Sequence, residues 1–252
     1  MWNLKGQTAV VTGGSKGIGK ATVEELLELG CKVMFTARDP EAIKICEEEL
    51  QKKGFNVEGF VADVSKEEDL DKILTQVNEK WSSLHILVNN AGINIRKKAL
   101  EYSEEEFRKV LEINLTAPFK LSRKLHSALK ASGNGKVINV SSVAAAQDVG
   151  TGTPYAMSKA GLLQQTRSLA VEWAHDNIRV NAVSPWFTKT PLTDGLLMQE
   201  ERMQPILQGT PLKRVAESSE IASIIAFLAM DKSSYITGQN IVADGGMSVN
   251  AV

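Results

Sequence analysis

The chain has 252 residues, a length within the range of one α/β domain. Its net charge is −1, and its lysines and arginines are dispersed, apart from the short run Arg96-Lys97-Lys98. This charge balance argues against a nucleic-acid or membrane-surface partner. A hydrophobic fraction of 43% and a charged fraction of 23% suit a soluble protein with a large core.

Short β-branched runs alternate with helical patterns along the chain. We predict strands at residues 8–12, 32–37, 57–62, 84–89, 136–140, 178–183 and 240–243. We predict helices at residues 21–29, 41–53, 66–81, 153–175 and 220–230, and another after Ser103-x-x-Glu106, which is typical of a capping box. Strands that alternate with helices favour a parallel sheet covered on both faces. The expected fold class is therefore α/β: a Rossmann-like three-layer sandwich, doubly wound, with about seven parallel strands in a single domain.

The stretch 184–214 shows no clear period and is rich in Thr, Pro, Leu and Met. We expect it to be irregular. Long segments of this kind inside a compact domain are often functional, so residues 185–214 are predicted to form a lid over the substrate. Apolar residues such as Leu192, Leu196 and Leu197 favour this interpretation over a membrane-touching helix.

Cys31 and Cys46 are the only cysteines, too few for a disulfide framework in a chain of this length. A reducing compartment, the cytoplasm, is expected. Residues 1–6 lack the apolar core of a signal peptide, and no run is long enough to span a membrane. No histidine has metal-ligand spacing with a cysteine or an acid, so no metal is expected.

A glycine-rich turn lies between the first predicted strand and the first predicted helix. Backbone N–H groups and the positive end of a helix bind a pyrophosphate at such a turn. A purely structural tight turn is the alternative, but the strand–turn–helix context favours a dinucleotide cofactor. The expected contacts are Gly13, Ser15, Lys16, Gly17, Ile18 and Gly19, with the spacing G-x-x-x-G-x-G.

The end of the second strand reads Ala37-Arg38-Asp39 and bears on which cofactor binds. An acid there hydrogen-bonds the ribose 2′-hydroxyl of NAD, whereas an arginine accepts the 2′-phosphate of NADP. Arg38 can donate to a phosphate with two N–H groups, and Lys16 adds a second cation. We therefore predict NADP(H). The alternatives are that both cations are solvated surface charges, or that Arg38 pairs with Asp39.

Tyr155 and Lys159 are four residues apart and share a face of the predicted helix 153–175. A nearby ammonium lowers the pKa of a tyrosine from about 10, which allows proton exchange with a substrate near neutral pH. The same spacing is common in amphipathic helices with a surface lysine. Ser142 upstream, together with the glycine turn, favours chemistry. Ser142 is not in a G-x-S-x-G elbow, so acyl transfer is unsupported.

The ordered set of motifs resembles the short-chain dehydrogenase/reductase family over nearly the whole chain. The motifs are the glycine turn, Asn89-Asn90-Ala91-Gly92, Asn114, Ser142, Tyr155-x-x-x-Lys159 and Gly238-Gln239-x-x-x-x-Asp244-Gly245-Gly246. Residues 2–6, the block 172–181 and Arg38 are most similar to the tropinone-reductase-like branch.

The resemblance implies four catalytic residues. Tyr155 is the expected general acid for carbonyl reduction, and the base in reverse, while Ser142 is expected to hydrogen-bond the substrate oxygen. Lys159 is expected to bind the nicotinamide ribose and to lower the pKa of Tyr155. Asn114 is expected to hold a water that links Lys159 to solvent. Two donors at the carbonyl oxygen stabilise the negative charge that hydride transfer leaves there.

The resemblance also implies further cofactor contacts and a substrate pocket. Asp63 and Val64 match the pair that contacts the adenine in the family. The other expected cofactor residues are Asn90, Ala91, Gly92, Tyr155, Lys159, Pro185, Thr188 and Thr190. The family often has Pro-Gly where this chain has Pro185-Trp186. The tryptophan is expected to crowd the nicotinamide or to line the substrate pocket, and a peripheral position is the alternative. The expected pocket residues are Ser142, Trp186, Leu192, Leu196 and Leu197.

The favoured function is an NADPH-dependent reductase of a medium-sized, largely hydrophobic ketone, similar to tropinone reductase. A 3-oxoacyl thioester (acyl-carrier-protein) reductase is a second hypothesis, which the basic run Arg96-Lys97-Lys98 keeps open. A non-catalytic NADP-binding sensor or interaction protein is a third, disfavoured because Tyr155 and Lys159 are both present. The resemblance implies a homotetramer or homodimer.

Overall fold

The computed structural model describes residues 2–250. Its central layer is a parallel seven-stranded sheet in the order β3-β2-β1-β4-β5-β6-β7. The strands are β1 (Thr8–Thr12), β2 (Lys32–Ala37), β3 (Glu58–Val61), β4 (Ile86–Asn89), β5 (Gly135–Val140), β6 (Ile178–Pro185) and β7 (Asn240–Ala243). The order reverses between β1 and β4, and open α/β sheets bind ligands beyond the carboxyl ends of the strands at such a point.

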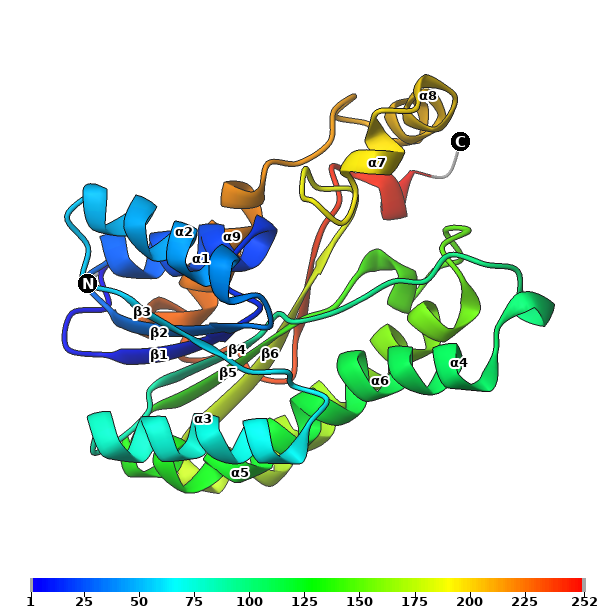
Figure 1. Cartoon of the computed structure of the whole chain (residues 1–252). Helices are drawn as coiled ribbons and strands as arrows, with labels where there is room; N and C mark the ends of the chain where they lie inside the picture. The colour runs from blue at the N-terminus through cyan, green and yellow to red at the C-terminus, as the bar shows by residue number, and fades with distance from the viewer. Residues whose placement is uncertain (1, 251–252) are drawn as a thin grey trace.

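Helices cover both faces of the sheet (Figure 1). One face carries α1 (Gly17–Glu28), α2 (Pro40–Lys52) and α9 (Ser218–Ala229); the other carries α3 (Glu67–Lys80), α5 (Ala117–Ala131) and α6 (Thr153–Glu172). Two buried apolar clusters fill the two layers, and neighbouring residues of one strand serve different clusters: Val11 packs with α1 and α9, Val10 with α3 and α5. The predicted three-layer α/β sandwich in a single domain is confirmed.

The Ser103 capping box forms as predicted. The Glu106 N–H donates to Ser103 Oγ at 3.1 Å, and the Ser103 N–H donates to Glu106 Oε2 at 3.0 Å. The helix that follows, α4 (Glu104–Leu111), continues through a π-helical turn, η2 (Glu112–Thr116), directly into α5. A π turn inserts one residue into the helix and re-aims the side chains around it. Short 3₁₀ helices occupy several connections: η1 (Ala99–Glu101), η3 (Val143–Ala145), η4 (Ala174–Asp176), η5 (Asp231–Ser233) and η6 (Met247–Val249).

The stretch 184–214 is not irregular, so that expectation was wrong. It contains the end of β6 and two short helices, α7 (Asp194–Leu197) and α8 (Glu200–Gly209). Figure 1 shows both helices standing away from the sheet, on the side where β6 ends. Ile206 is the one buried residue of the two helices. Helices that bury so little have no apolar stripe from which a period can be recognised.

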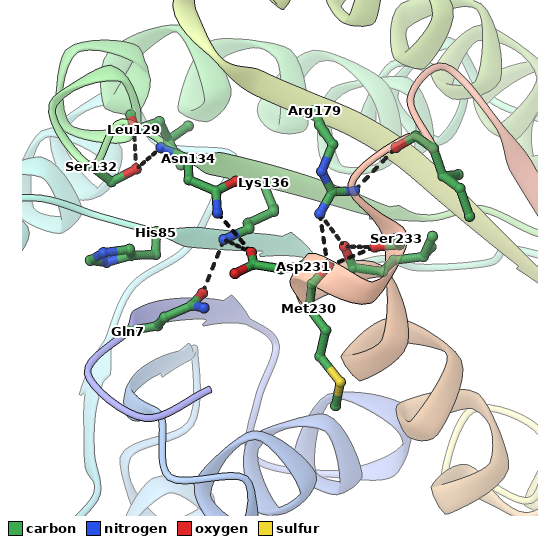
Figure 2. Close-up of polar contacts among 12 residues, drawn as sticks. Gln7, His85, Leu129, Ser132, Asn134, Lys136, Arg179, Met230, Asp231 and Ser233 are labelled. Carbon is green, nitrogen blue, oxygen red and sulfur yellow. Dashed lines mark hydrogen bonds and ion pairs between the residues drawn. The ribbon is translucent and has the colours of Figure 1, made fainter. Parts of the chain in front are cut away.

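A buried polar network lies around Lys136, near the start of β5 (Figure 2). The Lys136 side chain is 1% exposed, and its ammonium donates to Gln7 Oε1 at 3.1 Å. Asp231 Oδ1 lies 3.6 Å from the same ammonium and also accepts a hydrogen bond from Asn134 at 2.7 Å. Burial lowers the pKa of Lys136 to about 8.

None of the helices within residues 2–250 is long and apolar enough to cross a lipid bilayer.

Candidate active site

The structure brings Asn114, Ser142, Tyr155 and Lys159 together beside the carboxyl ends of β4 and β5. Ser142 lies close enough to Tyr155 to lower the pKa of its hydroxyl. The Lys159 ammonium donates to the carbonyl of Val140, the last residue of β5, at 2.8 Å. A Cβ built on Gly92 would lie 3.2 Å from Asn114 Oδ1 and 3.6 Å from Lys159 Nζ, so both groups flank the chain just after β4. The four predicted catalytic residues therefore form one cluster.

Gly152 sets the point at which α6 begins, and with it the positions of Tyr155 and Lys159. It has φ +107°, a conformation that favours glycine, and a Cβ there would overlap the Tyr102 hydroxyl. The Tyr102 hydroxyl in turn donates to the Ile95 carbonyl. The loops after β4 and β5 are therefore packed together around the start of α6. The sequence pattern did not indicate this role of Tyr102.

Burial raises the pKa of Tyr155 above its usual value, while Ser142 and the charge of Arg96 lower it in opposition. Lys159 is not among these causes. Its ammonium lies over the face of the Tyr155 ring, 5.7 Å from the centroid, rather than at the hydroxyl. The expected effect of Lys159 on the Tyr155 pKa therefore stays a prediction for the cofactor-bound protein.

Lys159 is 5% exposed and forms no ion pair with any carboxylate of residues 2–250. Burial lowers the pKa of its ammonium to about 8. An ammonium has three N–H donors, and the Val140 carbonyl takes one of them. The remaining donors suit hydroxyl acceptors such as those of a ribose, which fits the role that the family resemblance implies.

Asn114 lies in the π-helical turn and is fully buried. The Ile93 N–H donates to its Oδ1 at 2.9 Å, and its Nδ2 donates to the Ile93 carbonyl at 2.9 Å and to Ser158 Oγ at 3.1 Å. Ser158 Oγ donates to the Tyr155 carbonyl at 2.7 Å. Both side-chain donors of Asn114 are thus used to tie the loop after β4 to α6. Its expected part in a water relay stays a prediction.

The glycine turn has the form that a pyrophosphate requires. A Cβ on Gly19 would overlap the Gly13 carbonyl and the Asn90 amide, so the close approach of turn and helix excludes a side chain there. Asn90 Nδ2 donates to the carbonyls of Thr12 and Gly13 at 2.9 and 3.1 Å. Asn90, predicted to contact the cofactor, therefore also holds the turn. Lys16 occupies the N-cap of α1 without a side-chain cap, which leaves the first N–H groups of α1 available to an anion.

Arg38 is exposed at the end of β2 and forms no ion pair within residues 2–250. Asp39 instead caps α2, accepting from the N–H groups of Glu41 and Ala42 at 3.0 and 3.4 Å. The alternative in which Asp39 neutralises Arg38 is therefore not what the structure shows. A free guanidinium at this position fits a 2′-phosphate.

The predicted adenine contacts differ from one another. Asp63 lies in the connection between β3 and α3. Its Oδ1 accepts hydrogen bonds from the N–H and hydroxyl of Ser65 at 3.0 and 2.7 Å. Val64 is 8% exposed and packs into the core with α3 and α5. Its side chain belongs to that core, so a contact of Val64 with adenine falls to its main chain.

The chain after β6 is held by a threonine that the sequence did not single out. Thr193 Oγ1 donates to the Thr188 carbonyl at 2.5 Å and accepts from the Thr190 N–H at 3.1 Å. Thr190 in turn lies beside the glycine turn, since a Cβ on Gly17 would be 3.2 Å from its Cβ. A groove of about 390 Å³ opens here. Its lining includes Gly17, Lys20, Thr190, Asp194 and Ser218.

Trp186 follows Pro185, which pairs with Ala243 of β7. The half-buried indole N–H donates to Thr210 Oγ1 at 3.1 Å, so the tryptophan ties the start of the lid segment to its far end. Leu192 is 48% exposed, whereas Leu196 and Leu197 are half-buried. No group of three or more potential metal ligands occurs among residues 2–250.

Comparisons with known proteins agree with this geometry. The family model described as Enoyl-(Acyl carrier protein) reductase matches residues 13–248. A tropinone reductase homolog of Arabidopsis thaliana is 45% identical over 250 residues, which is 99% of this chain and 95% of that protein. Senescence-associated protein 13 of the same plant is 44% identical over 99% of this chain and 93% of its own length. A putative NAD(P) dependent gluconate 5-dehydrogenase from Beutenbergia cavernae, solved with bound NADP, superposes with a TM-score of 0.94 at 34% identity over 99% of each chain.

The chain belongs to the short-chain dehydrogenase/reductase family, as its motifs predicted. Its similarity to tropinone reductase homologs over nearly its whole length confirms the predicted branch. It is therefore an oxidoreductase of a family that uses nicotinamide cofactors, and the solved relative carries NADP, the cofactor that Arg38 predicts.

Proposed function

We propose that the protein interconverts a ketone and a secondary alcohol with NADP(H), with Tyr155 as general acid in reduction and general base in oxidation. The observation that carries this proposal is the Asn114–Ser142–Tyr155–Lys159 cluster at the end of β5, beside a glycine turn and a free arginine. The bound cofactor supplies or accepts the hydride.

The Ser142 and Tyr155 hydroxyls have different roles at the carbonyl oxygen of the substrate. Ser142 lies close enough to Tyr155 to lower the pKa of its hydroxyl, so both hydroxyls can turn to donate to one oxygen atom placed beside them. In reduction the oxygen gains negative charge, which both donors stabilise, and it then takes the phenolic proton. The Lys159 ammonium, 5.7 Å from the Tyr155 ring, stabilises the phenolate left behind.

Residues 185–214 form the proposed lid over the substrate. Its helices bury one residue, Ile206, and segments with little burial open at low cost in free energy. Trp186, Leu192, Leu196 and Leu197 are the proposed wall of the pocket.

Relatives named tropinone reductase homologs support a ketone substrate. The description of the family model supports the alternative, a carrier-linked thioester, for which the exposed Lys98 in the loop after β4 offers a cation.

A substrate screen tests the proposal. NADPH oxidation is measured with cyclic ketones, quinones, diketones and 3-oxoacyl thioesters, and at least one carbonyl class is expected to give turnover. Tight NADPH binding without turnover on any carbonyl compound would contradict the enzyme and favour a nucleotide sensor.

Replacing Arg38 with alanine is expected to weaken NADPH binding about 10–100-fold, the loss of a charged hydrogen-bonding partner, while changing NADH binding about twofold or less. Dissociation constants from fluorescence titration measure both. Lys32→Ala, at the other end of β2, is the control and should alter neither. An equal loss for both cofactors would rule out the 2′-phosphate contact.

We also propose a homodimer or homotetramer. Strand β7 is at the edge of the sheet, and Val242 on it is 44% exposed. Tyr235 and Val171 are exposed nearby, since the chain at Gly238 lies against Ala170. Apolar residues beside an unpaired edge strand suit a second copy. Light scattering is expected to give twice or four times the chain mass, and a smaller mass for Tyr235→Lys with Val171→Lys; a wild-type monomer would contradict this.

The proposed location is the cytoplasm. Both cysteines are free and buried, and burial raises the pKa of Cys31 to about 12 and that of Cys46 to about 11. Such thiols are unreactive at neutral pH. Free, unreactive thiols are compatible with a reducing compartment.

A further inference from the structure

Thr193 lies where the chain leaves the body of the protein and enters the proposed lid. Before it, the segment 187–189 is fixed to the body of the protein. The Ala216 N–H donates to the Phe187 carbonyl at 3.0 Å, and the Lys189 N–H donates to the Ala216 carbonyl at 2.9 Å. The first helix of the lid, α7, begins at the residue after Thr193. Thr193 therefore joins a fixed segment to a lid helix.

The Thr193 hydroxyl contacts the two threonines of the preceding segment that are expected to bind the cofactor. It donates to the Thr188 carbonyl at 2.5 Å and accepts from the Thr190 N–H at 3.1 Å. Its oxygen also lies 3.0 Å from the Thr190 hydroxyl and 3.0 Å from the Thr190 carbonyl. One side chain thus holds Thr188 and Thr190 in a fixed arrangement.

A single proton decides how the hydroxyls of Thr190 and Thr193 are oriented. The Thr193 hydroxyl has one proton to donate, and the Thr188 carbonyl is its closest acceptor. Because that proton is used, the bond between the two hydroxyls needs the proton of Thr190. The Thr190 hydroxyl therefore points its proton at Thr193. No other hydrogen bond from residues 2–250 reaches the Thr190 hydroxyl oxygen, so its lone pairs are open to a donor on a ligand.

Thr190 lies against the glycine turn. A Cβ built on Gly17 would be 3.2 Å from both the Cβ and the methyl carbon of Thr190. The carbon atoms of Thr190 therefore face the turn, while its hydroxyl faces Thr193. Thr190 and Gly17 also line the groove of about 390 Å³ together. The open lone pairs of Thr190 thus belong to a side chain beside the proposed cofactor site.

We infer that Thr193 is a positioning residue for the cofactor, and that its hydroxyl fixes the Thr190 hydroxyl as a hydrogen-bond acceptor for the amide NH₂ of the nicotinamide. A carboxamide has a donor side and an acceptor side, and a hydroxyl that rotates freely can bind either. A hydroxyl held as an acceptor binds only the NH₂ side, which selects one orientation of the carboxamide. This inference rests on the cofactor part of the proposed function.

Binding of NADP⁺ and of its 3-acetylpyridine analogue, which has a methyl group in place of the amide NH₂, tests the inference. Isothermal titration calorimetry gives both dissociation constants. The wild type is expected to bind NADP⁺ about 3–10-fold more tightly than the analogue, the contribution of one neutral hydrogen bond. Thr193→Val removes the hydroxyl with little change of shape and should lose this preference by weakening the binding of NADP⁺ alone. Thr193→Ser keeps the hydroxyl and should keep the preference.

Thr210→Val is the matched control. Thr210 belongs to the same lid segment, and its hydroxyl also donates to a backbone carbonyl, that of Ile206 at 2.6 Å, and accepts from an N–H, that of Trp186 at 3.1 Å. This variant loosens the base of the lid but should keep the preference for NADP⁺. In a double-mutant cycle, Thr193→Val should change the NADP⁺ affinity of Thr190→Val by about twofold or less, because Thr193 acts through Thr190.

Three results would overturn the role of Thr193. They are equal binding of NADP⁺ and the analogue by the wild type, equal losses for both in Thr193→Val, and a Thr193→Ser variant with as little preference as Thr193→Val. The second of these would indicate a purely structural hydroxyl. The preference is measured by binding and not by turnover. A protein that showed it but reduced no carbonyl compound would therefore keep the role of Thr193 and lose the proposed reaction.

Discussion

Tyr155→Phe is expected to lower kcat/KM for NADPH-dependent ketone reduction by about 10²–10⁴-fold, the usual contribution of a general acid. The variant keeps the ring, over which Lys159 lies, and keeps the Ser142 donor. It removes the proton that the substrate oxygen must take. Because the proposed NADPH contacts are chiefly the glycine turn, the helix N-terminus and Arg38, the dissociation constant of NADPH should change about twofold or less.

The control for this variant is Tyr235→Phe, which removes the hydroxyl of a tyrosine that is exposed in the single chain, keeps the ring that the proposed subunit interface uses, and should keep wild-type turnover. Single-turnover measurements at 340 nm separate the hydride step from product release. Wild-type rates in Tyr155→Phe would show that the general acid is another group. Lost NADPH binding would show instead that the substitution had disturbed the cofactor site.

The parts of the site that topology determines could be predicted from the sequence. Ser142 and the glycine turn follow strands of a parallel sheet, so their strand positions alone place them at one edge of it. Tyr155 and Lys159 lie together because helical spacing is regular. The motifs that carry the family resemblance are of this local kind.

Other features depend on contacts between distant segments. The spacing of apolar residues along the sequence does not reveal the π-helical turn around Asn114, because α4 and α5 continue on either side of it. Asn90 holds the glycine turn from the end of a different strand, a contact that only the fold creates. The Lys159 ammonium donates to the Val140 carbonyl because a buried charge needs a hydrogen-bond acceptor nearby. Helical spacing does not predict which acceptor this is.

Lys159→Met is expected to remove activity without removing stability. The ammonium is buried and has no carboxylate partner within residues 2–250, so methionine, which is similar in length and apolar, relieves a desolvation cost. We expect a melting temperature at pH 7 equal to or above that of the wild type. We expect kcat/KM to fall about 10²–10³-fold, as when one stabilising donor is lost from a transition state.

Lys136→Met is a matched control, because Lys136 is equally buried, has a pKa of about 8 and lies in the network of Figure 2, away from Tyr155. Each folded pKa is depressed below the unfolded value of about 10.4. The unfolded chain therefore binds more protons between about pH 8 and 10.4, and the wild-type free energy of unfolding rises with pH across that window. The rise is at most about 3 kcal/mol per lysine.

Denaturant titrations at pH 7, 8, 9 and 10 should show a smaller rise in the free energy of unfolding for each methionine variant than for the wild type, and the smallest for the double variant. Activity should separate the two lysines, since Lys136→Met keeps the wild-type kcat/KM and Lys159→Met does not. If both variants lost activity equally, the loss would follow from the fold and not from the site. If neither changed the slope, the ammonium groups would be better solvated than their burial implies. A flattened slope in both, with turnover lost in one, would separate the structural cost of a buried lysine from the catalytic use of one.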